Sequence, residues 1–289
     1  MSDYYDELGE GGDAVRWAGW RHRIAQALRF EVALEAVDLV GARTLLDVGC
    51  GPGALSSYVE ATGRDLDYLG IDRYVRVIEH ARQRHFEPPR GQEAKENLGV
   101  RSFEAWDVFD GRLDGRSFDA VVAVGTLVSG EVVASEGERQ MRLRRLVERL
   151  SDLAAGVACL VVLDQDVLES RPLMTLDPAL MGARETELTS LAREMGKPFL
   201  IRRGFLETEL AIHLLNDEKE RDELSQESSV ATIEKVLQGP WSENLSTGER
   251  AWLWLAAGYP PRAAALLDNS KDDLDELAQL IRQRLALKT

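Results

Sequence analysis

Three glycines on alternate positions, Gly49, Gly51 and Gly53, follow an apolar run that carries Asp47 near its end. Glycine adopts positive φ angles and lets a ligand approach main-chain N–H groups without meeting a side chain. Residues 54–62 read as a helix whose N-terminus points at the same place, where unpaired N–H groups favour polar or anionic ligands. The spacing therefore predicts a loop that cradles a nucleoside-bearing cofactor.

The glycines by themselves leave the identity of this cofactor open. Residues 49–54 fit the dinucleotide fingerprint G-x-G-x-x-G/A, which binds a nicotinamide cofactor. The same residues also suit S-adenosylmethionine, so the choice depends on the side chains around the loop.

Two further carboxylates extend the loop into a larger constellation with Asp47. Asp72 ends the second predicted strand, about twenty residues past the loop, and Asp107 ends the third. Because parallel strands end along one edge of a sheet, the three carboxylates should line one crevice. Asp72 can accept both ribose hydroxyls, and Asp107 can accept the adenine amine while Trp106 or Val108 covers the ring. The alternative, that each carboxylate only caps the next helix, is disfavoured by the ordered set.

These residues must be positioned by alternating strands and helices. After a first helix at 17–39, the pattern predicts strands ending at Val48 and at 67–72, 100–106, 118–124 and 156–163, with helices at 54–62, 75–84 and 141–154. Such alternation indicates a doubly wound α/β fold with a parallel sheet. Two strand-like runs, at 199–203 and 207–214, are too close for a helix between them, so the last strand should be antiparallel.

The chain divides by this pattern into three segments. Residues 1–42 form an N-terminal segment with the first helix, 43–216 the α/β domain, and 217–289 a helical extension that begins with a charged run. A capping box at 246–249 supports the helices of the extension. Three of the six tryptophans lie there: Trp241, Trp252 and Trp254. So much apolar surface must pack on the α/β domain or form a homodimer interface.

Composition limits the partners of the chain. The 289 residues carry a formal charge of -15, which opposes binding to nucleic acid. The acidic start lacks a targeting signal, and no stretch approaches the roughly 18 apolar residues of a membrane span. We therefore expect a cytoplasmic protein that binds no membrane. Its two cysteines, Cys50 and Cys159, are expected to be free thiols.

The sequence resembles the class I S-adenosylmethionine-dependent methyltransferases at residues 45–53, 70–72, 105–108 and 118–123. The resemblance covers about residues 20–216 and implies a seven-stranded Rossmann-like sheet with an antiparallel last strand. That strand agrees with the hairpin inferred above and argues against a dehydrogenase. Residues 19–30 and the closing segment are also similar to a small bacterial and phage subgroup whose substrates are undefined.

The resemblance also implies cofactor contacts, residue by residue. Asp47 would organise the loop, Asp72 would hold the ribose hydroxyls, and Asp107 with Trp106 would bind adenine. Residues 123–126 would bound the methionine amino group. The expected cofactor-binding set is Asp47, Gly49, Cys50, Gly51, Gly53, Asp72, Arg73, Trp106, Asp107, Val108, Val124 and Gly125.

The residues after the fourth strand bear on the methyl acceptor. Residues 125–130 lack the Asn/Asp-Pro-Pro-Tyr/Phe motif of amino-methyltransferases that act on DNA and some proteins. No spacing of Asp, Asn and His indicates a metal site, so we expect a metal-independent reaction. A small molecule with an oxygen or nitrogen acceptor fits best. Thr126 and Ser129 follow this strand on the expected substrate side.

The first helix supplies the remaining candidates. His22 is a possible general base, although a solvated helix residue is the stronger interpretation. Gln26 and Arg29 could hold a carboxylate of the cofactor or substrate, or could be a polar cap and a surface ion pair. No catalytic residue is assigned, because an in-line methyl transfer needs mainly alignment.

Two other functions compete with a methyltransferase. A regulatory or scaffolding protein could bind S-adenosylmethionine or S-adenosylhomocysteine without turnover and use its helical extension as the functional surface. A nicotinamide-dependent reductase is the third hypothesis.

Overall fold

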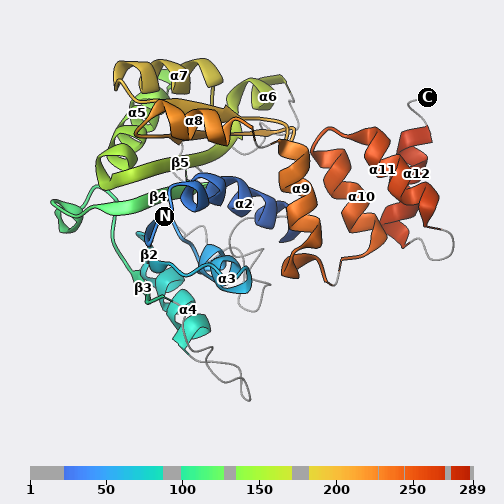
Figure 1. Cartoon of the computed structure of the whole chain (residues 1–289), viewed down its shortest axis with the longest axis horizontal. Helices are drawn as coiled ribbons and strands as arrows, with labels where there is room; N and C mark the ends of the chain where they lie inside the picture. The colour runs from blue at the N-terminus through green and yellow to red at the C-terminus, as the bar shows by residue number, and fades with distance from the viewer. Residues whose placement is uncertain are drawn as a thin grey trace.

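The centre of the molecule is a sheet that has eight strands among the described residues (Figure 1). The computed structural model describes residues 23–86, 99–126, 135–170, 182–226, 228–243, 245–270 and 275–286. The strand order is β3-β2-β1-β4-β5-β8-β7, and β6 pairs with β5. The strands are β1 (Thr44–Val48), β2 (Asp67–Ile71), β3 (Arg101–Glu104), β4 (Phe118–Val124), β5 (Ala154–Asp164), β6 (Gly182–Ala183), β7 (Phe199–Arg202) and β8 (Glu209–Leu214).

The strand directions confirm the predicted fold class. β1 to β6 pair in parallel, whereas β8 runs antiparallel to both of its neighbours, β5 and β7. The last strand is therefore reversed, as the short link between the two runs requires. β6 was not predicted, because a strand of two residues has no periodicity to read.

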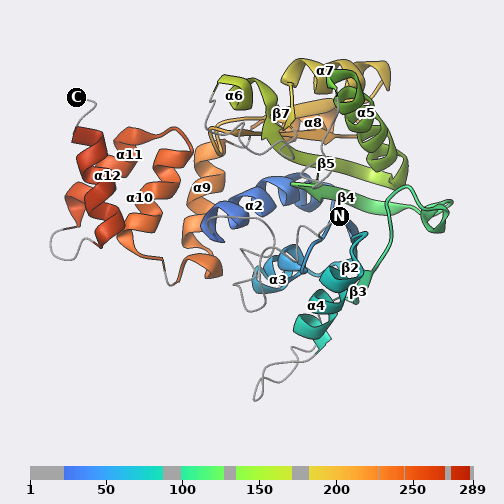
Figure 2. The same ribbon diagram turned by 180° about the vertical axis from the view of Figure 1, so that it is seen from behind.

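Helices cover both faces of the sheet (Figures 1 and 2). One hydrophobic cluster joins the sheet to α2, α3 and α4, and a second joins the opposite face to α5 and α7. β4 contributes side chains to both clusters, since Val122 belongs to the first and Val121 to the second. The helices of the α/β part are α2 (Arg23–Leu39), α3 (Ala54–Ala61), α4 (Val75–Phe86), η1 (Gly111–Leu113), α5 (Glu136–Leu153), α6 (Gln165–Ser170) and α7 (Glu185–Glu194).

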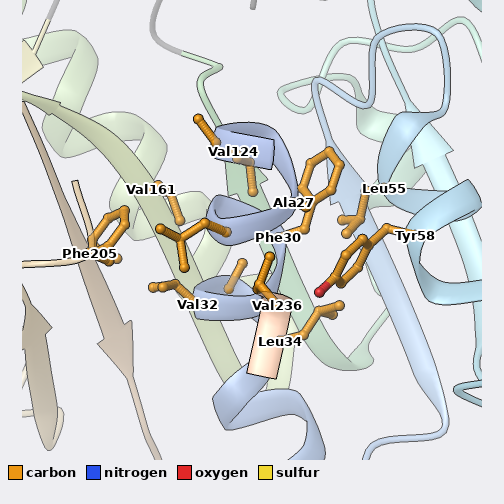
Figure 3. Packing of buried hydrophobic residues seen from close by; sticks show 14 of the residues in the cluster. Ala27, Phe30, Val32, Leu34, Leu55, Tyr58, Val124, Val161, Phe205 and Val236 are labelled. Atoms are coloured by element: carbon orange, nitrogen blue, oxygen red, sulfur yellow. The ribbon is translucent and has the colours of Figure 1, made fainter. Parts of the chain in front are cut away.

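Helix α2 lies at the centre of the first cluster. Figure 3 shows Phe30 and Leu34 of α2 close to Tyr58 of α3. Arg29, in the second turn of α2, bonds to Glu209, which is in register with Leu163 near the end of β5. The first turns of α2 therefore lie at the edge where the parallel strands end, and its last turn leads into β1.

The helical extension packs against the α/β part through the same cluster. It comprises α8 (Glu218–Leu224), α9 (Ser229–Gln238), η2 (Pro240–Ser242), α10 (Thr247–Ala256), α11 (Pro260–Asn269) and α12 (Glu276–Ala286). Ile233 and Val236 of α9 are buried with residues of α2, and Trp254 of α10 is buried as well. Figures 1 and 2 both show α9 beside α2 and α10 to α12 beyond it. The boundary at residue 216 stays a prediction, because a single hydrophobic cluster crosses it.

Several element boundaries differ from the predicted ones. β3 ends at Glu104, so Trp106 lies on the loop that follows the strand. α5 begins at Glu136, five residues before the predicted start, because the Ser135 side chain caps it by accepting from the Glu138 N–H at 3.2 Å. The charged run at 217–223 forms most of α8. Both cysteines are buried and free. Within the described ranges, no helix combines the length and apolar character that crossing a membrane requires.

Candidate functional site

The glycine loop connects β1 to α3 and has the predicted backbone conformation. Gly49, Gly51 and Gly53 have φ angles of 72°, 53° and 79°, a region that side chains other than glycine rarely occupy. Gly53 is also the N-cap of α3. The N–H groups of Gly49 and Cys50 donate to the Ile71 carbonyl at 2.8 and 3.0 Å. The loop is therefore fixed to the end of β2.

Side chains from outside the loop pack directly on it. A Cβ on Gly49 would lie 2.6 Å from the Thr126 side chain, whose hydroxyl donates to the Val48 carbonyl at 2.8 Å. Thr126 was predicted as a substrate contact, and the structure places it against the loop. A Cβ on Gly53 would lie 2.9 Å from His85 Nε2. Glycine is thus needed at both positions for close packing as well as for its φ angle.

Asp72 lies at the end of β2, against the glycine loop. Its Oδ2 accepts the Gly51 N–H and its Oδ1 accepts the Tyr74 N–H, both at 3.1 Å. Burial raises the pKa of Asp72, while these backbone donors and the Arg73 charge oppose the rise. Arg73 itself donates to the Tyr74 hydroxyl at 2.9 Å. A carboxylate at this position can accept ribose hydroxyls, and that role stays a prediction.

Asp47 lies beneath the loop and is 3% exposed. The Tyr68 hydroxyl donates to its carboxylate, and within the described part of the chain no arginine or lysine forms an ion pair with it. Burial raises the pKa of Asp47 to about 7; the Tyr68 hydrogen bond opposes the rise and the Asp72 charge adds to it. The site therefore holds a buried carboxylate without a cation.

Sequence reasoning missed Tyr68, because it sits in β2 as one more large residue of a buried strand. The available signal was its spacing: it precedes Gly70 by two residues and so faces the same side of the sheet. Gly70 is in register with Asp47, and a Cβ on Gly70 would lie 2.9 Å from Cys50 Sγ. A small residue opposite Asp47 therefore leaves room for Cys50.

The expected adenine end lies on the loop after β3. Asp107 is exposed, and its Oδ1 accepts the Phe109 N–H at 2.9 Å. Val108 is buried, and Trp106 is half-buried with the guanidinium groups of Arg112 and Arg116 within 6 Å of its ring centroid. The Asp107 carboxylate faces solvent and can receive a ligand.

His85 is a second residue that the sequence did not point to. Its Nε2 lies 3.1 Å from the Gly53 carbonyl, and its ring stacks on Phe103 at 4.9 Å between centroids. Burial lowers the pKa of His85, although the bond to Gly53 opposes this. A neutral imidazole that donates from Nε2 therefore holds the third glycine in place.

The first turns of α2 bring two predicted substrate residues to the same edge. Gln26 is 1% exposed, and its Nε2 has no partner in the ranges that the structure describes. Arg29 bonds to Glu209 through Nε at 2.6 Å and through a second, shorter contact from Nη2. A ligand carboxylate would have to displace Glu209 from Arg29. His22 and Ser129, also predicted, lie outside the described residues.

The end of β4 closes the site on its other side. Val124 is 9% exposed, Gly125 has a φ angle of 73°, and the Gly125 N–H donates to the Val161 carbonyl at 3.0 Å. The structure thus gathers the predicted residues of β1, β2 and β4, and of the loop after β3, at one sheet edge. No group of three or more His, Cys, Asp or Glu side chains with metal-binding geometry is found among the described residues.

The strand order and this edge agree with the resemblance to class I methyltransferases. The family model described as "Methyltransferase domain" matches residues 46–152, which run from β1 to α5. This part of the chain is therefore similar to that family, and the predicted resemblance is confirmed. No curated protein matches the sequence.

Solved structures show the same fold. Magnesium protoporphyrin IX methyltransferase from Synechocystis PCC 6803, with bound SAH, is 15% identical over 74% of this chain and 93% of its own, with a TM-score of 0.50. An O-methyltransferase family protein from Burkholderia thailandensis is 14% identical over 67% of this chain and 57% of its own, also with a TM-score of 0.50. At these identities the likeness shows the fold alone.

Proposed function

We propose that this protein is an S-adenosylmethionine-dependent methyltransferase that modifies an oxygen or nitrogen of a small molecule. The observation that carries the proposal is the buried Asp47 carboxylate without a cation, directly beneath a glycine loop with positive φ angles. S-adenosylmethionine brings a sulfonium and an ammonium group, which suit this site. A nicotinamide dinucleotide brings two phosphates, which the Asp47 carboxylate beneath the loop would repel.

The residues at the edge can hold the parts of this cofactor. The backbone of the glycine loop would approach the methionine and the sugar, Asp72 would accept the ribose hydroxyls, and Asp107 with Trp106 would bind adenine. The cofactor supplies an activated methyl group. The protein then has to align the acceptor and exclude water. In reactions of this kind, such positioning lowers the activation barrier substantially.

On the expected acceptor side, one polar side chain is available to a ligand and another is already paired within the protein. Gln26 offers a buried amide N–H without a partner among the described residues, and Arg29 is engaged by Glu209. We propose that a small molecule binds here, that the reaction needs no metal, and that it takes place in the cytoplasm. The formal charge of -15 supports the exclusion of nucleic acid. A homodimer through the C-terminal helices is proposed from the apolar content of the extension alone.

Calorimetry with S-adenosylmethionine and S-adenosylhomocysteine tests the cofactor. We expect both to bind the full chain, and failure of both would overturn the proposal. Incubation with labelled S-adenosylmethionine and a cell extract then tests turnover. Label in a small-molecule fraction supports the methyltransferase. Cofactor binding without label transfer to any fraction would favour the alternative of a regulatory or scaffolding protein.

A further inference from the structure

We propose that Asp47 and Tyr68 form a proton-linked cation site, which makes cofactor binding depend on pH. The inference rests on the proposed function, since it concerns the same cofactor. Asp47 is the residue that exchanges the proton, and Tyr68 is a positioning residue that acts through it.

The first support is the set of groups that face Asp47. From β2, the Tyr68 hydroxyl donates to the carboxylate, and Tyr68 is itself 1% exposed. Asp72, at the end of β2, and Cys50, in the loop, are the other titratable groups that interact with it. From β3, the Arg101 charge acts on Tyr68. Nothing in this set neutralises an ionised Asp47 directly.

The second support is the contrast with other buried carboxylates on the same face of the sheet. Glu31 is 1% exposed and pairs with Arg64 at 2.8 Å and with Lys235. Glu209 is 4% exposed and pairs with Arg29. Because a buried charge without a partner is costly, burial favours a proton on Asp47 in the free protein and a cation beside it when a ligand is bound.

The direction of the pH dependence follows from linkage. The pKa of Asp47 is raised to about 7, so the free site is protonated below neutral pH and ionised above it. A bound cation favours the ionised form, so binding releases the proton and becomes weaker as the pH falls. Between pH 8 and pH 6 the dissociation constant for S-adenosylmethionine should rise about tenfold. S-adenosylhomocysteine keeps the ammonium group, so a change of the same size with this ligand assigns the ammonium to Asp47, and a change confined to S-adenosylmethionine assigns the sulfonium.

Tyr68 sets the pH at which this change occurs. Its hydroxyl donates to the ionised carboxylate and so stabilises that form. Tyr68→Phe removes the donor and should move the midpoint of the binding profile upward by about one pH unit. A role in packing alone would leave the midpoint where it is.

The test is the dissociation constant of each ligand for the full chain, measured by calorimetry between pH 5.5 and pH 8. Tyr58→Phe is the matched control, because Tyr58 is also buried and donates to a buried carboxylate, Glu31, at 2.8 Å. We expect a raised midpoint for Tyr68→Phe and the wild-type midpoint for Tyr58→Phe. Asp47→Asn should remove the pH dependence of binding that comes from the protein. Any dependence that is left then comes from titration of the ligand itself.

Two results would overturn the inference: an unmoved midpoint in Tyr68→Phe, or full dependence in Asp47→Asn. If Asp47→Asn does not fold, the wild type and the two tyrosine variants decide. Failure of both ligands to bind at any pH overturns the proposed function. Tight binding of both with a flat pH profile overturns this inference alone.

Discussion

The buried carboxylates around α2 and those beneath the glycine loop differ in what neutralises them. The α2 carboxylates are Glu31, Glu35 and Glu209, and each pairs with an arginine: Arg64, Arg202 and Arg29 respectively. The loop carboxylates are Asp47 and Asp72, which accept hydrogen bonds from Tyr68 and from backbone N–H groups.

The electrostatic consequences separate Glu31 from Asp47, whereas burial raises the pKa of Glu35 in spite of its pairing with Arg202. Burial opposes ionisation of Glu31, but Arg64, Lys235 and Tyr58 hold its pKa below the usual range. Burial raises the pKa of Asp47 to about 7, because its one hydrogen-bond donor is neutral. The first arrangement joins α2 to its neighbours, whereas the second leaves an unmet charge at the site where we expect a cationic ligand. The missing counterion is thus a better indicator of the ligand than the carboxylate itself.

The largest expected effect comes from removing a cation in the α2 group. Arg29→Ala would leave Glu209 buried and unpaired, which should lower the free energy of unfolding by about 3–5 kcal/mol. Urea denaturation measures this change. Unchanged stability together with weaker ligand binding would show that Arg29 serves a ligand, as the sequence suggested, and not the fold.

Removing a carboxylate of the loop group should weaken ligand binding and change stability little. Asp72→Ala would remove the two hydrogen bonds that we propose to the ribose, each about 1.5 kcal/mol, and weaken S-adenosylhomocysteine binding about 100-fold. The free energy of unfolding should fall little, because a buried charge disappears as well. Unchanged affinity by calorimetry would refute the ribose assignment.

The free energy of unfolding should depend on pH through Asp47, and the raised pKa of this residue determines the sign of the dependence. Its folded pKa, about 7, exceeds its ordinary value of 3.8, so its contribution favours the folded state at low pH and is lost as the pH rises to 7. Asp47→Asn should therefore be more stable than the wild type, and this advantage should be about 2.5 kcal/mol larger at pH 8 than at pH 5. Denaturation curves at the two pH values provide the check, and a difference independent of pH would contradict the assignment.

A neutral hydrogen bond at the same loop should matter least. Thr126→Val keeps the contact with Gly49 and loses the 2.8 Å bond to the Val48 carbonyl, at a cost of about 1 kcal/mol in unfolding free energy. Thermal denaturation and turnover should both be measured on this variant. Lost turnover with normal cofactor affinity would indicate that Thr126 contacts the acceptor.

The sequence was sufficient to predict features that depend on a local pattern or on the length of a connecting segment. The glycine spacing predicted the positive φ angles at 49, 51 and 53, and the short link before Glu209 predicted the reversed strand. The strand ends placed Asp47 and Asp72 at one edge, where the structure has them. These features depend on backbone geometry, which a single segment determines.

Features that depend on distant partners could not be read in the same way. Arg29 and Glu209 are 180 residues apart, and nothing in either segment identifies the other. Tyr68 has the size and spacing of any residue in a buried strand, so its hydrogen bond to Asp47 appears only in the folded molecule. The docking of α9, through Lys235 to Glu31 and Thr232 to Glu35, has the same origin.

The most direct test of the account counts the protons that binding releases. Titration of S-adenosylmethionine into the full chain at pH 7, in two buffers of different ionisation enthalpy, gives this number for the wild type and for Asp47→Asn. Because Asp47 is about half protonated at this pH, we predict the release of about half a proton by the wild type beyond that seen with the variant. Equal proton release by the two proteins would contradict the claim that the ligand cation takes the place of a proton on Asp47.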